Sequence, residues 1–423
     1  MNKQQLANSL SDAMKRCEFL SYPEQQDWQL QRLKFLLNRA VKHVPLYQKH
    51  YQHCLPLINH IQNFTQIWQI PAISKEDYQQ IGAENYIDKR RNLARLVHKT
   101  TSGSLGRALD LYTTPLERLI RSRVFFSAWV KRIKPTDRLF CMAAPHVNFK
   151  RLSIPNVFIT TTMPADKVRQ LFLDFNPTVI IGSVEAVALL SRDLKKHNIS
   201  TSRIRLIFPF GQTLTPFLEA MIRESFSAEI VNLYGATETN WIGYECEAHN
   251  GLHIPSSNIV QIAKLNQPDT PAESGEIGEV IVTSLTRWTM PFIRYRLRDV
   301  ASLDLSPCSC GCHSPRLKKI EGRIQDFLIA TTGEWVSPGA IATDLAYRRP
   351  NILDHRIVQE LQSKVSVWIV PTVNFNQQQE FQHIANVIKH HLGLIEVEIK
   401  LVNEIPRDPS GKRRRVYRAF NLV

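Results

Sequence analysis

Four short stretches carry side chains that could bind phosphate and activate an acid. Hydroxyls and glycines crowd into residues 100–107, and a hydroxyl stands beside a carboxylate at Thr237 and Glu238. Asp299 closes an arginine-rich run, and Lys412 lies in a loop with proline and glycine. Glycine lets backbone N–H groups approach an anion, while a carboxylate holds Mg²⁺ against phosphate oxygens. Each stretch alone could equally be an ordinary turn, a solvated strand or a basic tail.

The residue types suggest a role for each stretch. Residues 100–107 lack the Gly-Lys-Ser/Thr ending of a Walker loop but could still wrap a triphosphate. Asp299 is a candidate for a bidentate hydrogen bond to ribose hydroxyls, and Tyr234 could stack on a base. Lys412 sits at a loop tip, where its flexible stem can place a charge against a reacting carboxylate and phosphate.

The cysteines suggest a metal site. There are seven, and three of them crowd into residues 308–312. In a reducing compartment such a cluster favours metal ligation over disulfides. Cys17, Cys54 and Cys141 stand in ordinary sequence, and we expect them to be packed thiols.

Composition limits the partners and the location. The 423 residues include 53 Lys and Arg against 38 Asp and Glu, a formal charge of +15. This predicts a polyanionic partner, whether nucleic acid, acidic lipid, a phosphorylated small molecule or an acidic protein. Hydrophobic residues make up 43% and charged residues 22%, which excludes wholesale disorder. We find no secretory leader and no run of about 18–20 apolar residues, so we expect a cytoplasmic protein without a membrane partner.

Strands and helices alternate in the middle of the chain and must position these side chains. Strands are predicted at 178–181, 204–208 and 229–233, and helices at 28–44, 184–197 and 217–226. The alternation predicts right-handed βαβ units on a parallel sheet. Thr237 and Glu238 would then follow the carboxyl end of a parallel strand, where open α/β folds bind ligands.

The predicted fold is α/β with two domains, because one core rarely grows beyond about 250–300 residues. A large N-terminal domain, residues 1–324, combines parallel βαβ layers with a β-rich subdomain that includes 277–283. After Gly322 the pattern restarts at a smaller scale, which predicts a small α+β C-terminal domain over residues 325–423.

In order and spacing, the four stretches resemble the adenylate-forming superfamily of acyl-CoA synthetases and adenylation domains. The matching patterns are Tyr-Gly-x-Thr-Glu at 234–238, Arg-Tyr-Arg-x-x-Asp at 294–299, Gly-Arg-x-x-Asp at 322–326 and Pro-Arg-x-x-Ser-Gly-Lys at 406–412. Phe175-Asn176-Pro177 and the cysteine-rich insert before Gly322 are typical of its phenylacetate–CoA ligase-like branch. The resemblance covers about residues 30–418 and implies an AMP-forming acid–thiol ligase.

The resemblance also implies which residues hold ATP. The β- and γ-phosphates would be held by Thr101, Ser102, Gly103 and Ser104. The adenine or acyl pocket would be flanked by Gly211, Tyr234 and Gly235, and the ribose by Asp299 and Arg323. This sequence departs from the usual pattern at Arg107, where lysine is usual, and at Gln325, where aspartate or lysine is usual. Gln212 replaces a common glutamate, and Arg298 replaces a small or acidic residue.

Three residues would carry the chemistry that the resemblance implies. Thr237 and Glu238 would contact the α-phosphate and Mg²⁺, and Lys412 the carboxylate and the α-phosphate in the transition state. Carboxylate and triphosphate repel each other, so these groups must neutralise charge where it develops. In this family the small C-terminal domain is mobile and swings about a hinge, here expected near Gln325, between adenylating and thioester-forming poses.

The relatives' pattern, with Cys-x-Cys-Gly and a histidine in Gly-Leu-His, also selects metal ligands. The favoured set is Cys246, His253, Cys308 and Cys310, ahead of Cys312, His313 or His249. Cys₃His is a closed, tetrahedral donor set typical of structural zinc. The alternative is a group of surface thiols beside a core histidine.

The acceptor thiol stays open between CoA and the phosphopantetheine arm of an acyl carrier protein. Carrier proteins are acidic, and a chain of charge +15 would be steered towards one. The branch favours aromatic acids, and a homodimer is a further option. A basic nucleic-acid-binding protein is disfavoured, because basic residues concentrate only at 412–418. An inactive binding scaffold is disfavoured because Glu238 and Lys412 are both present.

Overall fold

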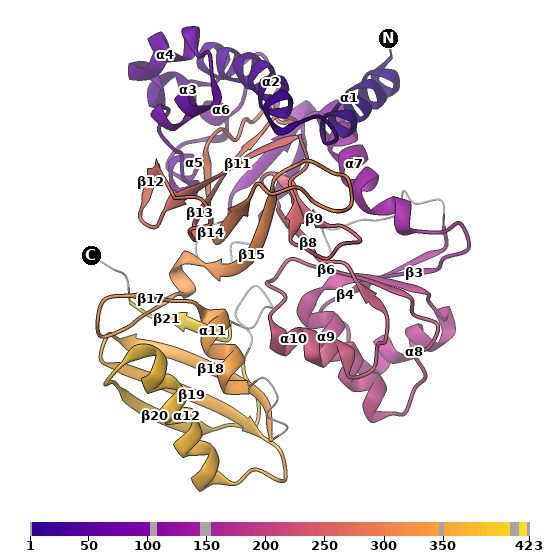
Figure 1. Ribbon diagram of the computed structural model, residues 1–423. Helices are drawn as coiled ribbons and strands as arrows, with labels where there is room; N and C mark the ends of the chain where they lie inside the picture. Colours follow the sequence, from indigo (N-terminus) through magenta and orange to yellow (C-terminus); the bar gives the residue numbers. More distant parts are fainter. Residues whose placement is uncertain (1, 102–107, 144–153, 347–350, 407–413, 421–423) are drawn as a thin grey trace. The chain divides into compact units, whose positions relative to one another are not determined.

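The computed structural model describes residues 2–101, 108–143, 154–346, 351–406 and 414–420. By contacts the chain divides into two compact units (Figure 1): unit 1 is Met1–Thr136 with Val231–Ile320, and unit 2 is Asp137–Ile230 with Glu321–Val423. Parallel and antiparallel sheets occur with many helices, so the predicted α/β class is confirmed. The cut after Ile320 lies near the predicted boundary at 325. Because unit 2 also includes Asp137–Ile230, the division into 1–324 and 325–423 stays a prediction.

Unit 1 begins with a layer of helices. They are α1 Lys3–Cys17, α2 Tyr22–His43, α3 Pro45–His50, α4 Leu55–His60, α5 Lys75–Gln79, α6 Ala83–Tyr86 and α7 Pro115–Trp129. The helix predicted at 28–44 is confirmed as α2, whose Leu30, Leu33 and Leu37 are buried on one face. Glu24 fixes the start of α2, because its carboxylate accepts the Ser21 N–H at 2.9 Å.

The β-rich part of unit 1 is an eight-stranded sheet in the order β12-β11-β13-β14-β15-β10-β9-β8. The strands are β8 Leu233–Ala236, β9 Asn240–Glu245, β10 Leu252–His253, β11 Asn258–Lys264, β12 Gln267–Pro271, β13 Gly278–Ser284, β14 Tyr295–Asp304 and β15 Arg316–Arg323. A separate hairpin pairs β1 Val97–Thr100 with β2 Asp110–Thr113. Val280 and Val282 of the sheet join Leu37 of α2 in one hydrophobic core.

Unit 2 contains the predicted parallel sheet, in the order β4-β3-β5-β6-β7. Its strands are β3 Leu139–Ala143, β4 Asn156–Thr160, β5 Val179–Ser183, β6 Leu206–Phe210 and β7 Glu229–Ile230, and its helices are α8 Ala165–Phe175, α9 Val184–Lys196 and α10 Pro216–Arg223. All of β3 is buried, as is typical of a parallel strand covered on both faces.

The chain leaves this parallel sheet at Ile230, earlier than predicted. Leu233–Ala236 forms β8, which pairs antiparallel with β9 in the other sheet. The prediction that Thr237 and Glu238 follow the carboxyl end of a parallel strand is therefore wrong. Glycine at 235 allows the alternative pairing, because a Cβ there would lie 2.6 Å from the carbonyl oxygen of Asn240.

The C-terminal part of unit 2 is the predicted α+β arrangement, a four-stranded sheet in the order β20-β19-β18-β21. Its elements are α11 Pro338–Ala346, β18 Ile352–Leu361, β19 Lys364–Pro371, α12 Gln377–Leu392, β20 Glu396–Leu401 and β21 Val416–Arg418, with a small hairpin of β16 Leu328–Ile329 and β17 Trp335–Val336. Ile384, Ile388 and Leu392 of α12 are buried along one stripe. Within the described ranges, every helix is too short or too polar to cross a lipid bilayer.

Candidate functional site

Tyr234 and Asp299 come from different strands of the unit 1 sheet and meet side chain to side chain. The Tyr234 hydroxyl donates to Asp299 Oδ2 at 2.7 Å. The register of β14 shifts between Arg296 and Val300, and Arg298 has a left-handed φ of 63°. Such bulges re-aim side chains beside binding sites. The backbone at 298 therefore suits a small residue, and an arginine there costs about 1–2 kcal/mol.

Glu238 lies in the tight turn between β8 and β9. Its carbonyl oxygen accepts a hydrogen bond from the Arg287 guanidinium, and its Oε1 accepts the Tyr295 hydroxyl at 3.4 Å. Thr237 is half-buried in the same turn. Since Tyr295 lies on β14, that one strand contacts both Tyr234 and Glu238. The structure thus brings together Tyr234, Glu238 and Asp299, the residues of unit 1 that were predicted to contact the base, the metal and the ribose.

Thr101 stands at the entry to the predicted phosphate loop. Its Oγ1 accepts the N–H of Leu109 at 2.8 Å, and its own N–H donates to the Leu109 carbonyl at 3.0 Å. These two bonds close the base of the loop. Ser102, Gly103 and Ser104 lie outside the described residues.

Two other predicted nucleotide residues, Gly211 and Arg323, belong to unit 2. Gly211 has a φ of +77°, which favours glycine, and Arg323 ends β15. Their pairing with Tyr234 and Asp299 of unit 1 stays a prediction. Lys412 lies outside the described residues.

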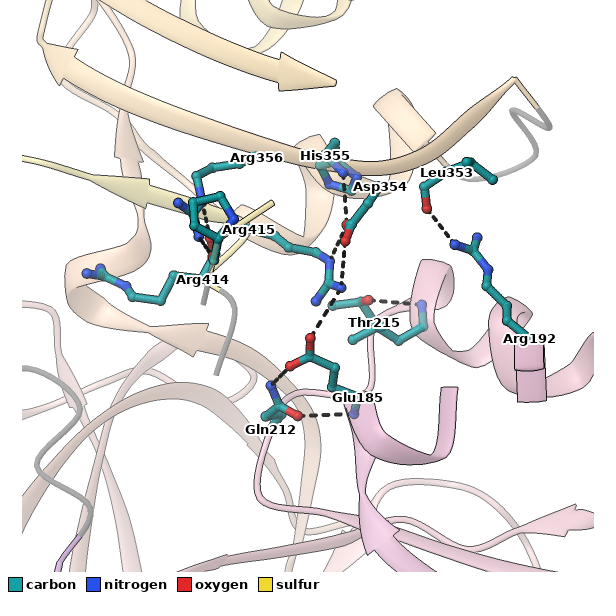
Figure 2. A network of polar contacts seen from close by, with 12 residues as sticks. Glu185, Arg192, Gln212, Thr215, Leu353, Asp354, His355, Arg356, Arg414 and Arg415 are labelled. Atoms are coloured by element: carbon teal, nitrogen blue, oxygen red, sulfur yellow. Dashed lines mark hydrogen bonds and ion pairs between the residues drawn. The ribbon is translucent and has the colours of Figure 1, made fainter. Parts of the chain in front are cut away.

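Arg356, Arg414 and Arg415 link the chain after residue 413 to other segments of unit 2 through hydrogen bonds and ion pairs (Figure 2). Arg414 donates through Nε to Asp326 Oδ1 at 3.1 Å. Arg415 donates through Nε to Asp354 Oδ1 at 2.9 Å and lies 3.9 Å from Glu185 Oε1. Glu185 is buried and accepts the amide of Gln212 at 3.4 Å.

The same region of unit 2 shows what sequence reasoning missed. A basic tail was the alternative interpretation of the stretch around Lys412, yet the Arg415 side chain is only 11% exposed and lies between two carboxylates that are distant in sequence. Arg356 adds a third contact, because its Nε donates to the Arg414 carbonyl at 3.0 Å (Figure 2). A run of arginines gives no signal for such partners.

The predicted metal ligands do gather in unit 1. One donor atom from each of Cys246, His253, Cys308 and Cys310 lies within 4.8 Å of the others. The Sγ atoms of Cys246 and Cys308 are 3.6 Å apart, and Cys310 Sγ is 3.4 Å from His253 Nε2. Tetrahedral zinc with Zn–S bonds of about 2.3 Å places sulfur atoms about 3.8 Å apart. The donor set therefore fits zinc in both chemistry and spacing.

A second contact orients the histidine. His253 is buried, and its Nδ1 lies 3.2 Å from the Ser314 carbonyl oxygen. A proton on Nδ1 leaves Nε2 facing Cys310 as the donor, as in most protein metal sites. Cys312 lies apart from the cluster, with its Sγ 3.6 Å from the Glu18 carbonyl oxygen.

Comparisons with known proteins agree with this fold. The CapK C-terminal domain family matches residues 328–419. Protein CapK of Staphylococcus aureus is 23% identical over 365 residues, which cover 82% of this chain and 79% of that protein. The phenylacetate–coenzyme A ligase of Escherichia coli K12 is 24% identical over 436 residues, covering 96% and 97%.

Solved structures share the fold. The 2-hydroxyisobutyryl-CoA ligase in its postadenylation state aligns with a TM-score of 0.81 at 18% identity, covering 96% of this chain and 91% of that one. The anthranilate CoA ligase AuaEII aligns with a TM-score of 0.58 at 16% identity, covering 75% and 65%. The chain is thus similar in sequence to phenylacetate–coenzyme A ligases, and similar in fold to other CoA ligases.

Proposed function

We propose that the protein is an AMP-forming acid–thiol ligase. It activates a carboxylic acid with ATP as an acyl-adenylate and then transfers the acyl group to a thiol. The observation that carries this proposal is the hydrogen bond between Tyr234 and Asp299, which joins two motif residues across the sheet. The likeness to a phenylacetate–coenzyme A ligase over 96% of the chain supports it.

In this proposal the residues of unit 1 hold the nucleotide. Asp299 accepts hydrogen bonds from the ribose hydroxyls while the Tyr234 hydroxyl holds its carboxylate in place. Glu238 is half-buried and keeps carboxylate lone pairs for Mg²⁺ beside its contact with Tyr295. Thr237 approaches the α-phosphate from the same turn, and bound Mg²⁺ would neutralise developing phosphate charge.

Lys412 supplies the positive charge that lets two anions meet. The acid's carboxylate attacks the α-phosphorus, and the bond to the bridging oxygen breaks as pyrophosphate leaves with its electron pair. A lysine beside both oxygens stabilises charge as it develops. The C-terminal part then moves about a hinge near Gln325, so that a thiol can attack the acyl carbon and release AMP.

We further propose that the Cys₃His cluster binds structural zinc, because a closed set of four buried or half-buried donors leaves no open position for substrate. The acid is proposed to be aromatic, and the acceptor to be CoA or an acyl carrier protein. A cytoplasmic location and a homodimer stay predictions of the sequence.

The decisive test is acid-dependent pyrophosphate release with ATP and Mg²⁺ across a panel of aromatic and aliphatic acids. Lys412→Ala should slow release about 100-fold or more, as expected for the loss of one transition-state contact. Lys400→Ala, an exposed lysine paired with Glu398, is the matched control and should keep full activity. No release with any acid would overturn the ligase assignment, and full activity in Lys412→Ala would overturn the role of that lysine.

A further inference from the structure

A basic surface lies in unit 1 where the C-terminal end of α2 meets the segment after α6. Residues 28–75 contain no acidic side chain, and neither do residues 89–109. These two stretches meet because the Lys89 N–H donates to the His43 carbonyl oxygen at 2.9 Å. Exposed side chains from both stretches therefore lie on one surface. We define the basic patch by its exposed residues Phe35, Lys42, Lys89, Arg90 and Arg91.

Two carboxylates lie beneath the patch, and both are buried. Asp88 is completely buried, and its Oδ2 pairs with Arg39 at 2.6 Å and with Arg90 at 2.7 Å. Glu117 also acts on Arg39 through its charge, and its Oε1 accepts the Trp288 N–H at 2.8 Å. These carboxylates fix the local structure but face away from solvent, so the charge offered to a partner is positive.

The other cations of the patch are exposed and keep their charge available. Lys42, Lys89 and Arg91 form no ion pair within the described ranges of the chain. Partial burial, followed by the charge of Arg90, lowers the pKa of His43. The positive charges therefore converge on the end of α2 and are not spread evenly over the helix.

One large apolar side chain stands among these cations. Phe35 is 62% exposed and lies on the same face of α2 as Asn38 and Lys42, at positions i, i+3 and i+7. The apolar face of α2, including Leu33 and Leu37, is buried in the core, so this helix does not lie in a lipid surface. Single-stranded nucleic acid stacks on several aromatic rings, and the patch offers one. Arginine beside an aromatic ring is typical of protein interfaces.

One loop joins the patch to the turn that carries Glu238. Arg39 Nε donates to the Trp288 carbonyl oxygen at 3.2 Å, and the Asp88 N–H donates to the next carbonyl of that loop at 2.7 Å. In the same loop the Arg287 guanidinium donates to the Glu238 carbonyl oxygen. A protein bound to the patch therefore docks on elements that are hydrogen-bonded to the catalytic turn.

We propose that the basic patch is the docking surface for an acidic acyl carrier protein that brings the acceptor thiol. The inference rests on the proposed function, which supplies the acyl-adenylate and leaves the acceptor open between CoA and a carrier. Four exposed positive charges complement an acidic helix, and Phe35 complements an apolar side chain within it. Pantetheine alone, a neutral thiol, has no surface with which to engage the patch.

The test measures binding of purified holo-acyl carrier proteins of the source organism to the full chain, by titration calorimetry at low ionic strength. Arg91→Glu should weaken binding about 10-fold or more, and Lys89→Glu and Phe35→Ala should also weaken it. Arg203→Glu is the matched control, because it reverses one exposed charge in unit 2 and should leave the affinity within about twofold. Acid-dependent pyrophosphate release without any thiol should be unchanged in Arg91→Glu.

Three results would overturn the docking surface. They are no carrier binding at all, equal losses in Arg91→Glu and Arg203→Glu, and binding of duplex DNA or anionic vesicles, but of no carrier, that Arg91→Glu abolishes. Equal losses would mean that net charge alone attracts the carrier. Carrier binding without pyrophosphate release from any acid would sink the proposed function and leave the patch standing. Pyrophosphate release without carrier binding would do the reverse.

Discussion

The Asp299 carboxylate is a single group on which nucleotide binding should depend. Tyr234 holds one of its oxygens at 2.7 Å, and the bulge in β14 aims it out of the regular strand. Asp299→Asn should raise the KM for ATP about 10-fold or more in pyrophosphate release, because an amide removes one acceptor. Tyr234→Phe should raise it less, and Asp12→Asn, an exposed change on α1, should have no effect. An unaltered KM in Asp299→Asn would exclude it as a ribose contact.

The metal cluster offers a matched pair of cysteines. Cys308→Ser should abolish bound zinc and lower the unfolding midpoint by roughly 5 °C or more, since metal binding contributes directly to folding. Cys312→Ser is the control, because that thiol contacts the Glu18 carbonyl and lies outside the donor set. Metal content by mass spectrometry decides the matter. Equal zinc in both variants, or none in the natural protein, would contradict the proposed site.

His355 should make unit 2 less stable in acid. It is completely buried, and burial lowers its pKa from 6.5 to about 4. The negative charge of Asp354 opposes this lowering of the pKa, and the positive charge of Arg415 adds to it. As pH falls below 6.5, His355 binds a proton in the unfolded chain before it does so in the folded protein. Stability is therefore present above pH 6.5 and is lost as pH falls towards 4, by about 2 kcal/mol at pH 5.

Urea unfolding at pH 7.5 and pH 5 checks the His355 effect. His355→Leu should reduce the difference in unfolding free energy between the two pH values, because it removes the group that titrates. The substitution breaks no hydrogen bond among the described residues, since neither ring nitrogen has a partner there. His390→Leu, an exposed change on α12, should retain the full difference. Equal pH dependence in His355→Leu and the natural protein would rule out this histidine as the cause.

At the scale of single residues, sequence patterns predict the chemical type of a site better than they predict which side chains contact one another. The four cysteine and histidine ligands were predictable because the relatives' pattern of Cys-x-Cys-Gly and Gly-Leu-His selects them, and the structure does gather them. The contact between the Arg287 guanidinium and the Glu238 carbonyl oxygen was not predictable. It depends on where the loop after β13 packs, which spacing along the chain does not encode.

Among the elements, the N-terminal end of α9 is coupled to the segment before β21. Glu185 joins Gln212 on one side and Arg415 on the other, and Arg415 lies three residues after Lys412 (Figure 2). Glu185→Gln and Arg415→Gln should each slow pyrophosphate release. Because they act on one contact, the double variant should be little slower than either single one, with a coupling energy of about 0.5–3 kcal/mol.

Rates of the two single variants and the double variant form a mutant cycle. Glu219→Gln, in an exposed pair with Arg223 on α10, serves as the control and should leave the rate unaltered. Strictly additive effects would show that Glu185 and Arg415 act independently.

Regular elements followed from periodicity, whereas their assembly did not. Helix α2 and the strands β5 and β6 of the parallel sheet have strong apolar patterns, and these predictions are confirmed. The predicted strand 229–233 is divided between two sheets, because Leu233 onwards pairs with β9. That partner lies just across the tight turn that carries Glu238, but an apolar run does not indicate which of two sheets its strand joins.

For the whole molecule, the charge of +15 should determine how fast an acidic acceptor associates with the protein. If an acidic carrier protein is the acceptor, its kcat/KM should fall about tenfold or more between 50 and 500 mM NaCl, because salt screens electrostatic steering. Pantetheine, a neutral thiol, should show little change. A carrier whose kcat/KM ignores salt would contradict steering by net charge.

Each unit is assembled from two stretches of chain, with a stretch of the other unit between them. A ribosome that has finished Thr136 must make the whole of Asp137–Ile230 before unit 1 can resume. At about 5–20 residues per second, the wait until Cys310 emerges is roughly 10 to 35 seconds. All four proposed metal ligands lie in that second stretch, the last of them ten residues before its end at Ile320. Metal capture would therefore coincide with the completion of unit 1 during synthesis.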